Sequence, residues 1–430
     1  MTNTGPRVVI VGGGAAGFFA AITCKEANRA ASVTILESSA APLAKVRISG
    51  GGRCNVTHDQ PDPALLVRNY PRGNRAMLGP FTRFGPRETV AWFEERGVAL
   101  KTEADGRMFP VTDDSATVID CLVGAARAAG VEVRTRSAVI DVEAQREIDG
   151  VGVGASDANQ TGARRASASF VLRLKSGGKV AADRVLLATG GAPAGYRWAA
   201  ALGHTIEPPV PSLFTFKIDD PRLRGLAGVS VQAGRVRLVG AKEAHEGPVL
   251  ITHWGLSGPA VLKASAWGAR LLHDHDYRLG LTVNWWPDAT EHEVREALLA
   301  ARLADARRTV LAAGPLDLPQ RLWRRLAAAA GADDHMRWGD ASNTLVAALV
   351  REVHGGHYEI SGKGVFKEEF VTCGGVRLKE VDFATMESRV TPGLHFAGEI
   401  LDIDGITGGF NFQSAWTTGW LAGRAMAEPS

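Results

Sequence analysis

Three glycines near the N-terminus, Gly12, Gly14 and Gly17, have the G-x-G-x-x-G spacing of a backbone turn that holds phosphate groups. In such a turn the first glycine permits a tight bend, the second lets the backbone approach a pyrophosphate, and the third lets a helix lie close to a strand. Glu37 follows Gly17 by 20 residues, where a carboxylate would accept hydrogen bonds from ribose hydroxyls. Because Glu37 would repel a 2′-phosphate, the pattern favours FAD or NAD over NADP.

The residues around these positions predict the elements that would hold them. Residues 8–11 are an apolar run typical of a buried strand, and residues 32–36 predict a second strand that ends at Glu37. Between them, the N-terminus of a predicted helix would present free N–H groups to the phosphates. We therefore expect a dinucleotide to contact Gly12, Gly14, Ala15, Ala16, Gly17 and Glu37. The alternative is an ordinary strand–helix–strand unit with a glycine-rich turn.

A second glycine-rich segment, residues 49–55, could hold an anion or the electron-rich edge of a ring. Its three consecutive glycines are flanked by Lys45 and Arg53, and the segment contains no acid. The alternative is a basic surface turn. Cys54 in this segment is more often a small packing residue than a reactive thiol.

Three motifs together resemble those of the BaiN–RdsA–aminoacetone oxidase flavoproteins. They are residues 49–55 (SGGGRCN), 252–259 (THWGLSGP) and 407–415 (TGGFNFQSA). The resemblance covers essentially the whole chain. It implies an α/β fold, with a glutathione-reductase-type FAD-binding Rossmann domain and a β-meander formed by residues 1–205 and 354–430. Residues 206–353 would form an inserted domain, part barrel and part helices, over the flavin, and the prolines at 208, 209 and 211 mark the linker at its start.

The resemblance also implies contacts to FAD from segments that lie far apart in the chain. Around the second glycine segment these contacts are Lys45, Gly51, Gly52, Arg53, Cys54 and Asn55. Val139 would touch the adenine through its backbone. Thr189 and Gly190 end a predicted buried strand and resemble a second FAD signature, for which the alternative is a plain strand before a turn.

The C-terminal motif would contact the other end of the cofactor. The resemblance places Gly398 and Glu399 at the ribityl–pyrophosphate region. It places four backbone N–H groups at the flavin pyrimidine, those of Gly409, Phe410, Asn411 and Phe412. A helix N-terminus there would stabilise the negative charge that the flavin gains on reduction. The alternative is a plain strand–helix unit.

His253 is the candidate catalytic residue. It lies in the second of the three motifs and could donate a proton near the flavin. A lone histidine is more often structural, and that role is the alternative.

Residues 68–87 could contact RNA. They contain five arginines and no Asp or Glu, with three aromatic residues interleaved. The alternative is a solvated segment whose aromatic side chains pack inward.

Length and composition restrict the class of protein. With 430 residues, 45% hydrophobic and 22% charged, the chain is expected to fold as a globular protein of more than one domain. The formal net charge of +3 names no partner, and the sequence does not specify an oligomeric state. Four cysteines far apart indicate reduced thiols in a cytoplasm, with no metal-ligand spacing. The sequence predicts neither a signal peptide nor a membrane span.

We consider three functions. The first is a two-electron flavoenzyme that reduces a carbon–carbon double bond, with NADH or NADPH as a transient donor, because no second G-x-G-x-x-G follows a later strand. Its substrate would be an RNA uridine or a small ring alkene, as the resemblance implies. The second is a flavin amine oxidase that produces hydrogen peroxide. The third is a non-enzymatic FAD-containing RNA-binding factor that uses residues 68–87.

Overall fold

The computed structural model describes residues 5–145, 169–364 and 371–428, and it divides into two compact units. The first unit contains Met1–Pro209 and Thr372–Ser430, and the second contains Val210–Val371. The second unit therefore starts close to the expected residue 206, but it continues past residue 353. The reason is that residues 356–363 form strands of the second unit's own sheet.

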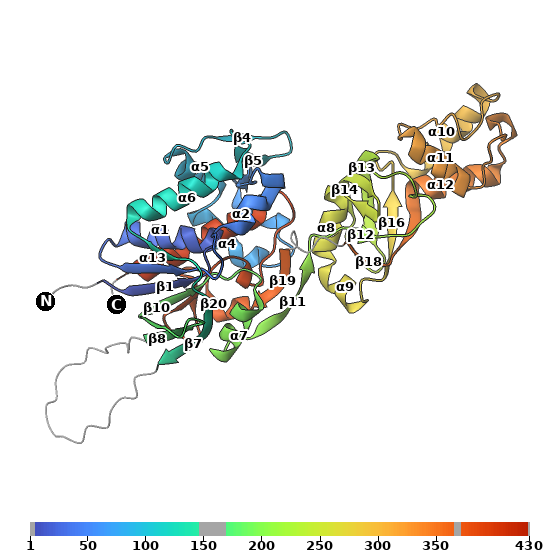
Figure 1. The fold of residues 1–430 in the computed structure, drawn as a ribbon. Helices are drawn as coiled ribbons and strands as arrows, with labels where there is room; N and C mark the ends of the chain where they lie inside the picture. The colour runs from blue at the N-terminus through green and yellow to red at the C-terminus, as the bar shows by residue number, and fades with distance from the viewer. Residues whose placement is uncertain (1–4, 146–168, 365–370, 429–430) are drawn as a thin grey trace, which may run out of the picture. The chain divides into compact units, whose positions relative to one another are not determined.

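A seven-stranded sheet with a parallel centre forms the core of the first unit (Figure 1). Its order is β20-β21-β22-β10-β1-β2-β6, and the strands from β22 to β6 pair in parallel. The strands are β1 (Arg7–Val11), β2 (Ser32–Leu36), β6 (Glu132–Arg134), β10 (Arg184–Leu187), β20 (Val381–Asp382), β21 (Glu387–Ser388) and β22 (Leu394–Phe396). The carboxyl ends of β22, β10, β1 and β2 therefore meet at one edge of the sheet.

Helices cover this sheet, and two of them are packed unusually closely. A Cβ atom on Gly419 or Gly423 of α13 would lie 2.6 or 2.5 Å from the carbonyl oxygen of Ala16 or Ala20 in α1, so only glycine permits this approach. The helices are α1 (Ala15–Ala27), α2 (Ala44–Ile48), α3 (Pro63–Leu66), α4 (Asn74–Arg83), α5 (Pro86–Glu94), α6 (Ser115–Ala129), α7 (Pro193–Ala201) and α13 (Phe410–Ala427). The α/β class and the Rossmann-type domain are confirmed.

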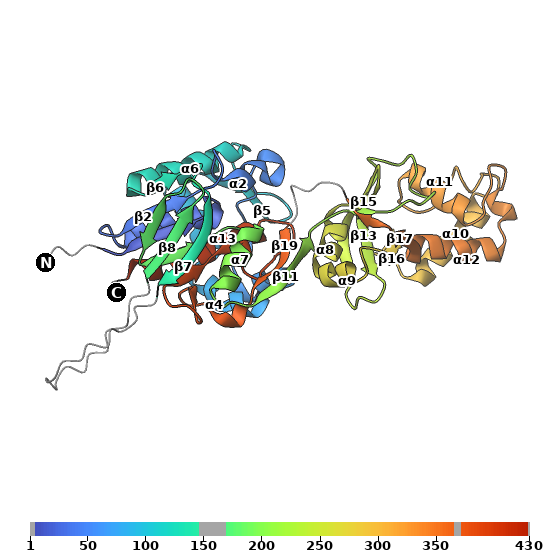
Figure 2. The ribbon, with the colours of Figure 1, turned by 60° about the horizontal axis from the view of Figure 1, so that its bottom comes forward.

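Three small sheets complete the first unit and its connections. Strands β7 and β8 are antiparallel neighbours in a meander with β9 (Figure 2). The strands are β3 (Thr57–His58), β4 (Leu100–Thr102), β5 (Arg107–Pro110), β7 (Val139–Gln145), β8 (Ser169–Leu174), β9 (Lys179–Ala182), β11 (Ile206–Ser212) and β19 (Val371–Val376). The three glycines of the second glycine segment lie in the short 3-10 helix η1 (Ser49–Gly52), and β3 begins shortly afterwards at Thr57.

The second unit is an antiparallel sheet with helices. Its order is β17-β16-β13-β14-β15-β12-β18, and Ser361 alone separates the two end strands along the chain. The strands are β12 (Phe216–Lys217), β13 (Ser230–Leu238), β14 (His245–Thr252), β15 (Gly255–Ser257), β16 (Leu279–Asn284), β17 (Gly356–Ile360) and β18 (Gly362–Lys363). The helices are α8 (Pro259–Trp267), α9 (Ala269–Asp274), α10 (Glu291–Ala304), α11 (Gln320–Ala329) and α12 (Asn343–Gly355).

Helices α10, α11 and α12 gather at one end of this unit (Figure 1). Trp285, Trp323 and Trp338 are almost fully buried in its core. In neither unit does the described chain contain a helix long and apolar enough to cross a bilayer.

Candidate functional site

The first glycine turn lies at the carboxyl end of β1, and its three glycines have different surroundings. Gly12 has a φ of +111°, and a Cβ atom there would lie 2.4 Å from the carbonyl oxygen of Ala188. A Cβ atom on Gly17 would lie 2.1 Å from the carbonyl oxygen of Gly12. A Cβ atom on Gly14 would meet nothing within 4 Å. Gly12 and Gly17 are therefore required by the fold, whereas the space beside Gly14 is open for a ligand.

Two backbone N–H groups hold the carboxylate of Glu37 beside this turn. Gly13 donates to Oε2 at 2.8 Å, and Ser39 donates to Oε1 at 2.7 Å. The N–H of Ser137 donates to the carbonyl oxygen of Glu37 at 2.8 Å. The segment that leads into Val139, the first residue of β7, therefore lies next to Glu37. Glu37, the predicted ribose contact, and Val139, the predicted adenine contact, therefore lie close together.

The ends of β10 and β22 add a second group of predicted residues. Glu399 accepts a hydrogen bond from the N–H of Thr372 at 3.0 Å and forms an ion pair with Lys45. A Cβ atom on Gly190 would lie 3.5 Å from Oε2 of Glu399. The neighbouring Oγ1 of Thr189 is enclosed and makes no hydrogen bond to any described residue. An unpaired buried hydroxyl is costly, so the position of Thr189 is not explained by its hydrogen bonds.

Gly398, which precedes Glu399 in the chain, packs against the first turn of α1. It lies in the left-handed region, with a φ of +76°, and a Cβ atom there would lie 3.1 Å from the Cβ atom of Ala16. Its N–H donates to Oγ1 of Thr418 at 2.9 Å. The start of α1 has no side-chain cap, so the N–H groups at Ala15 and Ala16 are placed to bind an anion.

The second glycine segment presents its backbone to open space. Gly50, Gly51 and Gly52 all have positive φ, at +57°, +69° and +87°. A Cβ atom on Gly51 or Gly52 would meet nothing within 4 Å. Because Leu43 N–H donates to the carbonyl oxygen of Gly13 at 2.8 Å, the chain leading to this segment begins at the first glycine turn.

Arg53 and Cys54 use their side chains for the fold. The guanidinium of Arg53 pairs with Oε1 of Glu103 at 2.7 Å and lies 4.0 Å from the ring centroid of Phe109. It is therefore directed at the β4–β5 segment rather than at an anion. Cys54 is fully buried, and burial raises the pKa of its thiol to about 12. The thiol is protonated at neutral pH and is not a nucleophile.

The start of α13 contacts the second glycine segment. A Cβ atom on Gly409 would lie 2.5 Å from the carbonyl oxygen of Thr57. With its amide nitrogen donating to the carbonyl oxygens of Thr57 and Met108, Asn55 accepts the N–H of Gly409 at 2.9 Å. That N–H is therefore already paired and does not face a ligand. The helix start has no side-chain cap, which leaves the N–H groups of Phe410, Asn411 and Phe412 for a ligand.

Side-chain contacts that the sequence patterns did not predict hold this helix start in place. The Tyr70 hydroxyl donates to the carbonyl oxygen of Phe410 at 2.6 Å. The amide of Asn411 makes two 2.9 Å hydrogen bonds with the backbone of Gly405. Arg72 pairs with the fully buried carboxylate of Asp404. The sequence marked Arg72 only as one of the arginines in the acid-free run of residues 68–87, and that pattern does not predict its pairing with Asp404.

The arginine-rich residues 68–87 are therefore only partly a surface. Tyr70, Phe81 and Phe84 are buried, as the inward-packing alternative predicts. Arg72 is committed to Asp404, whereas Arg75 is exposed.

His253 lies in the second unit, whereas both glycine turns lie in the first. It occupies the turn between β14 and β15 and is exposed. It lines a cavity of about 340 Å³ together with Thr252, Gly255, Asp219 and Asp220. An imidazole there can exchange protons with a molecule in the cavity.

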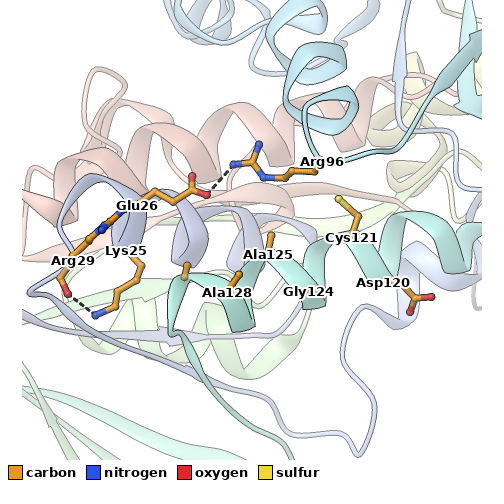
Figure 3. Close-up of a pocket in the computed structure, with 10 residues that line it drawn as sticks. Lys25, Glu26, Arg29, Arg96, Asp120, Cys121, Gly124, Ala125 and Ala128 are labelled. Carbon is orange, nitrogen blue, oxygen red and sulfur yellow. Dashed lines mark hydrogen bonds and ion pairs between the residues drawn. The ribbon is translucent and has the colours of Figure 1, made fainter.

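A larger cavity, of about 850 Å³, is lined by residues outside both glycine turns, and Figure 3 shows its lining side chains. It is lined by Lys25 and Arg29 at the far end of α1 and by Asp120 and Cys121 of α6. At 1.5 Å per residue, Lys25 lies about 15 Å along the helix from Ala15. Arg96 and Glu26 both line this cavity and form an ion pair.

The residues at the carboxyl edge fit an extended dinucleotide such as FAD. The open backbone at Gly14 suits a pyrophosphate, and the oriented carboxylate of Glu37 suits a ribose. The open backbone at Gly51 and the uncapped start of α13 suit the edge of a flavin ring.

Comparisons with known proteins agree over almost the entire chain. The sequence model described as HI0933-like protein Rossmann domain matches residues 6–425. The chain is 32% identical to the 3-dehydro-bile acid delta(4,6)-reductase of Clostridium scindens, over 98% of this chain and 99% of that protein. It is 30% identical to the ribosomal RNA dihydrouridine synthase of Escherichia coli, over 97% of each.

One solved structure shows the same overall fold. It is the 3-ketosteroid-delta4-(5alpha)-dehydrogenase from Rhodococcus jostii RHA1 in complex with 4-androstene-3,17-dione. The match has a TM-score of 0.50 at 17% identity and covers 100% of this chain and 98% of that one.

Proposed function

The chain belongs to the HI0933-like family of FAD-dependent oxidoreductases, and from this premise we propose that it reduces a ring carbon–carbon double bond. The family is the one that the three sequence motifs predicted. NADH or NADPH would bind transiently as the electron donor. The observation that carries the cofactor part of this proposal is the open backbone at Gly14, Gly51 and Gly52, next to two helix starts without side-chain caps. The likeness to a bile acid reductase supports the double bond as substrate.

Each part of the cofactor has a proposed set of partners. Glu37 would accept the ribose hydroxyls, and the segment at Val139 would meet the adenine. Gly14 and the first N–H groups of α1 would hold the pyrophosphate. The start of α13 would face the pyrimidine end of the flavin. The chemistry that FAD supplies when bound is two-electron transfer between a nicotinamide and a substrate carbon.

Reduction of a double bond also requires a proton. His253 is our candidate donor, because its exposed imidazole lines a cavity large enough for a small ring. FAD, when bound, would supply hydride to one carbon of the double bond, and the other carbon would need a proton, for which His253 is the candidate donor. Asp219 and Asp220 line the same cavity, and each pairs with an arginine, Arg224 and Arg222 respectively.

We infer that the sheet of the second unit closes as a barrel. Its end strands β17 and β18 pair with β16 and β12, respectively. Because Ser361 alone separates β17 from β18, one extended segment spans both ends of the sheet. This continuity supports the barrel that the resemblance implied.

Two substrate classes share the proposed chemistry. The names of both relatives describe ring systems that lose a carbon–carbon double bond. We favour a small ring alkene, since the relative with higher identity acts on a bile acid. The exposed arginines of residues 68–87 favour an RNA uridine instead, although Arg72 does not belong to that surface.

Purification tests the proposal directly. The protein should be yellow, with a flavin visible spectrum, or should acquire that spectrum when FAD is added. Anaerobic NADH or NADPH should bleach it. A folded protein that does not bind added FAD would contradict the proposal. If an amine, but neither NADH nor NADPH, reduced the bound FAD, the result would favour the amine oxidase.

A further inference from the structure

One peptide unit, between Gly408 and Gly409, is held at both ends by side chains from the second glycine segment and β3. Nδ1 of His58 lies 3.0 Å from the carbonyl oxygen of Gly408. Oδ1 of Asn55 accepts the N–H of Gly409 at 2.9 Å, in the amide orientation that satisfies all of its neighbours. The two side chains therefore clamp the peptide that directly precedes α13.

The clamp fixes the protonation of His58. A carbonyl oxygen only accepts hydrogen bonds, so Nδ1 of His58 must carry the proton. Burial lowers the pKa of His58, so the neutral ring with Nδ1 protonated is the form at neutral pH. The ring stacks on Phe410, with centroids 4.5 Å apart and planes at 27°. Gly106 packs against Nε2, where a Cβ atom would lie 2.6 Å away.

This peptide needs a clamp because its own conformation is weakly restrained. Gly408 and Gly409 have φ of +129° and +92°, a region that glycine enters and leaves freely. Gly409 is also the N-cap residue of α13 and provides no side-chain cap. The orientation of the first N–H groups of α13 therefore depends on His58 and Asn55.

We propose that His58 is a positioning residue that sets the reduction potential of the cofactor through the Gly408 carbonyl. The inference rests on the proposed function, in which the start of α13 faces the flavin. A fixed helix start stabilises negative charge on the reduced cofactor better than a mobile one. Loss of the Nδ1 donor should therefore make reduction less favourable without removing any contact to the cofactor.

Two variants separate the donor from the ring. His58→Asn places an amide nitrogen where Nδ1 lies, so it keeps the donor and loses the ring. His58→Phe keeps the ring on Phe410 and loses the donor. His245→Phe is the matched control, since His245 stacks on Trp267 in the second unit at a centroid distance of 6.1 Å.

The measurement is the midpoint potential of bound FAD by equilibration with a redox dye. We expect His58→Asn and His245→Phe to keep the wild-type potential. His58→Phe should lower the equilibrium constant for two-electron reduction about tenfold, which is about 30 mV. A His58→Phe protein that binds FAD with the wild-type potential would overturn the inference alone. Wild-type protein without bound FAD would remove the proposed function and this inference together.

A spectroscopic measurement keeps the test independent of variant folding. In the full-length wild-type protein, ¹⁵N NMR should show His58 protonated at Nδ1 and bare at Nε2. The opposite tautomer would also overturn the inference, because Nδ1 could not then donate to Gly408.

Discussion

At the scale of single residues, glycines of one motif serve different purposes. Gly17 is demanded by the fold, because a Cβ atom would lie 2.1 Å from the Gly12 carbonyl oxygen. Gly14 is not, because its surroundings are open and its φ of −92° suits any residue. The G-x-G-x-x-G pattern predicted both glycines, and the structure shows that only Gly14 of the two has open space beside it.

This difference gives the first prediction. Gly14→Val should leave the unfolding of the apo protein nearly unchanged but abolish FAD binding, because its side chain would fill the pyrophosphate space. Gly17→Val, the matched control, should lower the unfolding temperature sharply. Thermal unfolding without FAD and a fluorescence titration with FAD measure the two effects. Wild-type FAD affinity in Gly14→Val would show that no phosphate lies there.

Glu37 gives the second prediction. Its carboxylate is oriented by Gly13 and Ser39, so it is ready to accept ribose hydroxyls at little entropic cost. Two such hydrogen bonds contribute about 3 kcal/mol, so Glu37→Ala should weaken FAD binding roughly a hundredfold. Glu37→Gln, which keeps one acceptor oxygen, should lose less. Equal FAD affinity in folded Glu37→Ala would refute the ribose role.

At the scale of elements, the start of α13 depends on a support that local pattern reasoning did not reveal. The glycines at positions 408 and 409 predicted this helix start, because the backbone conformation that precedes a helix depends on neighbouring residues in the sequence. The pairing of Arg72 with Asp404 joins positions 332 residues apart, and composition cannot show that. An arginine in a basic run is ordinarily solvated, so its burial against an aspartate is a tertiary effect.

The third prediction follows from that ion pair. Arg72→Ala leaves the fully buried Asp404 without its partner and should cost about 3 to 5 kcal/mol in the free energy of unfolding. Adding Asp404→Asn should recover part of the loss. Arg75→Ala, at an exposed position in the first turn of α4, should change stability by less than about 0.5 kcal/mol. If urea unfolding gave Arg72→Ala the same free energy of unfolding as wild type, the Arg72–Asp404 ion pair would not stabilise the fold.

At the scale of the whole molecule, the division into two units was predictable at its first boundary and not at its second. Prolines near residue 209 mark the first, since proline interrupts regular structure. The second boundary lies at residue 371 rather than 353. Strand β17 follows α12 directly and pairs with β16, and such long-range pairing leaves no local signal.

The fourth prediction concerns acid stability. His395 in β22 is only 3% exposed, and burial lowers its pKa to about 4 from the ordinary 6.5. Between these two values the unfolded chain binds more protons than the folded one, so stability is complete above pH 6.5 and falls as the pH drops toward 4. The loss should approach about 3 kcal/mol. In urea unfolding, the free energy of unfolding of His395→Gln should fall less steeply as the pH is lowered from 6.5 to 4. The same pH dependence as in wild type would show that His395 is not the cause.

The direction of electron flow tests the central claim most directly. The enzyme is reduced anaerobically with NADH or NADPH and then mixed, in separate stopped-flow experiments, with air-saturated buffer, a ring enone, or ribosomal RNA lacking dihydrouridine. We predict rapid reoxidation by one of the two alkene substrates, with one reduced double bond per FAD, and slow reoxidation by air. Rapid reoxidation by air with stoichiometric peroxide, and none by either alkene, would contradict a reductase.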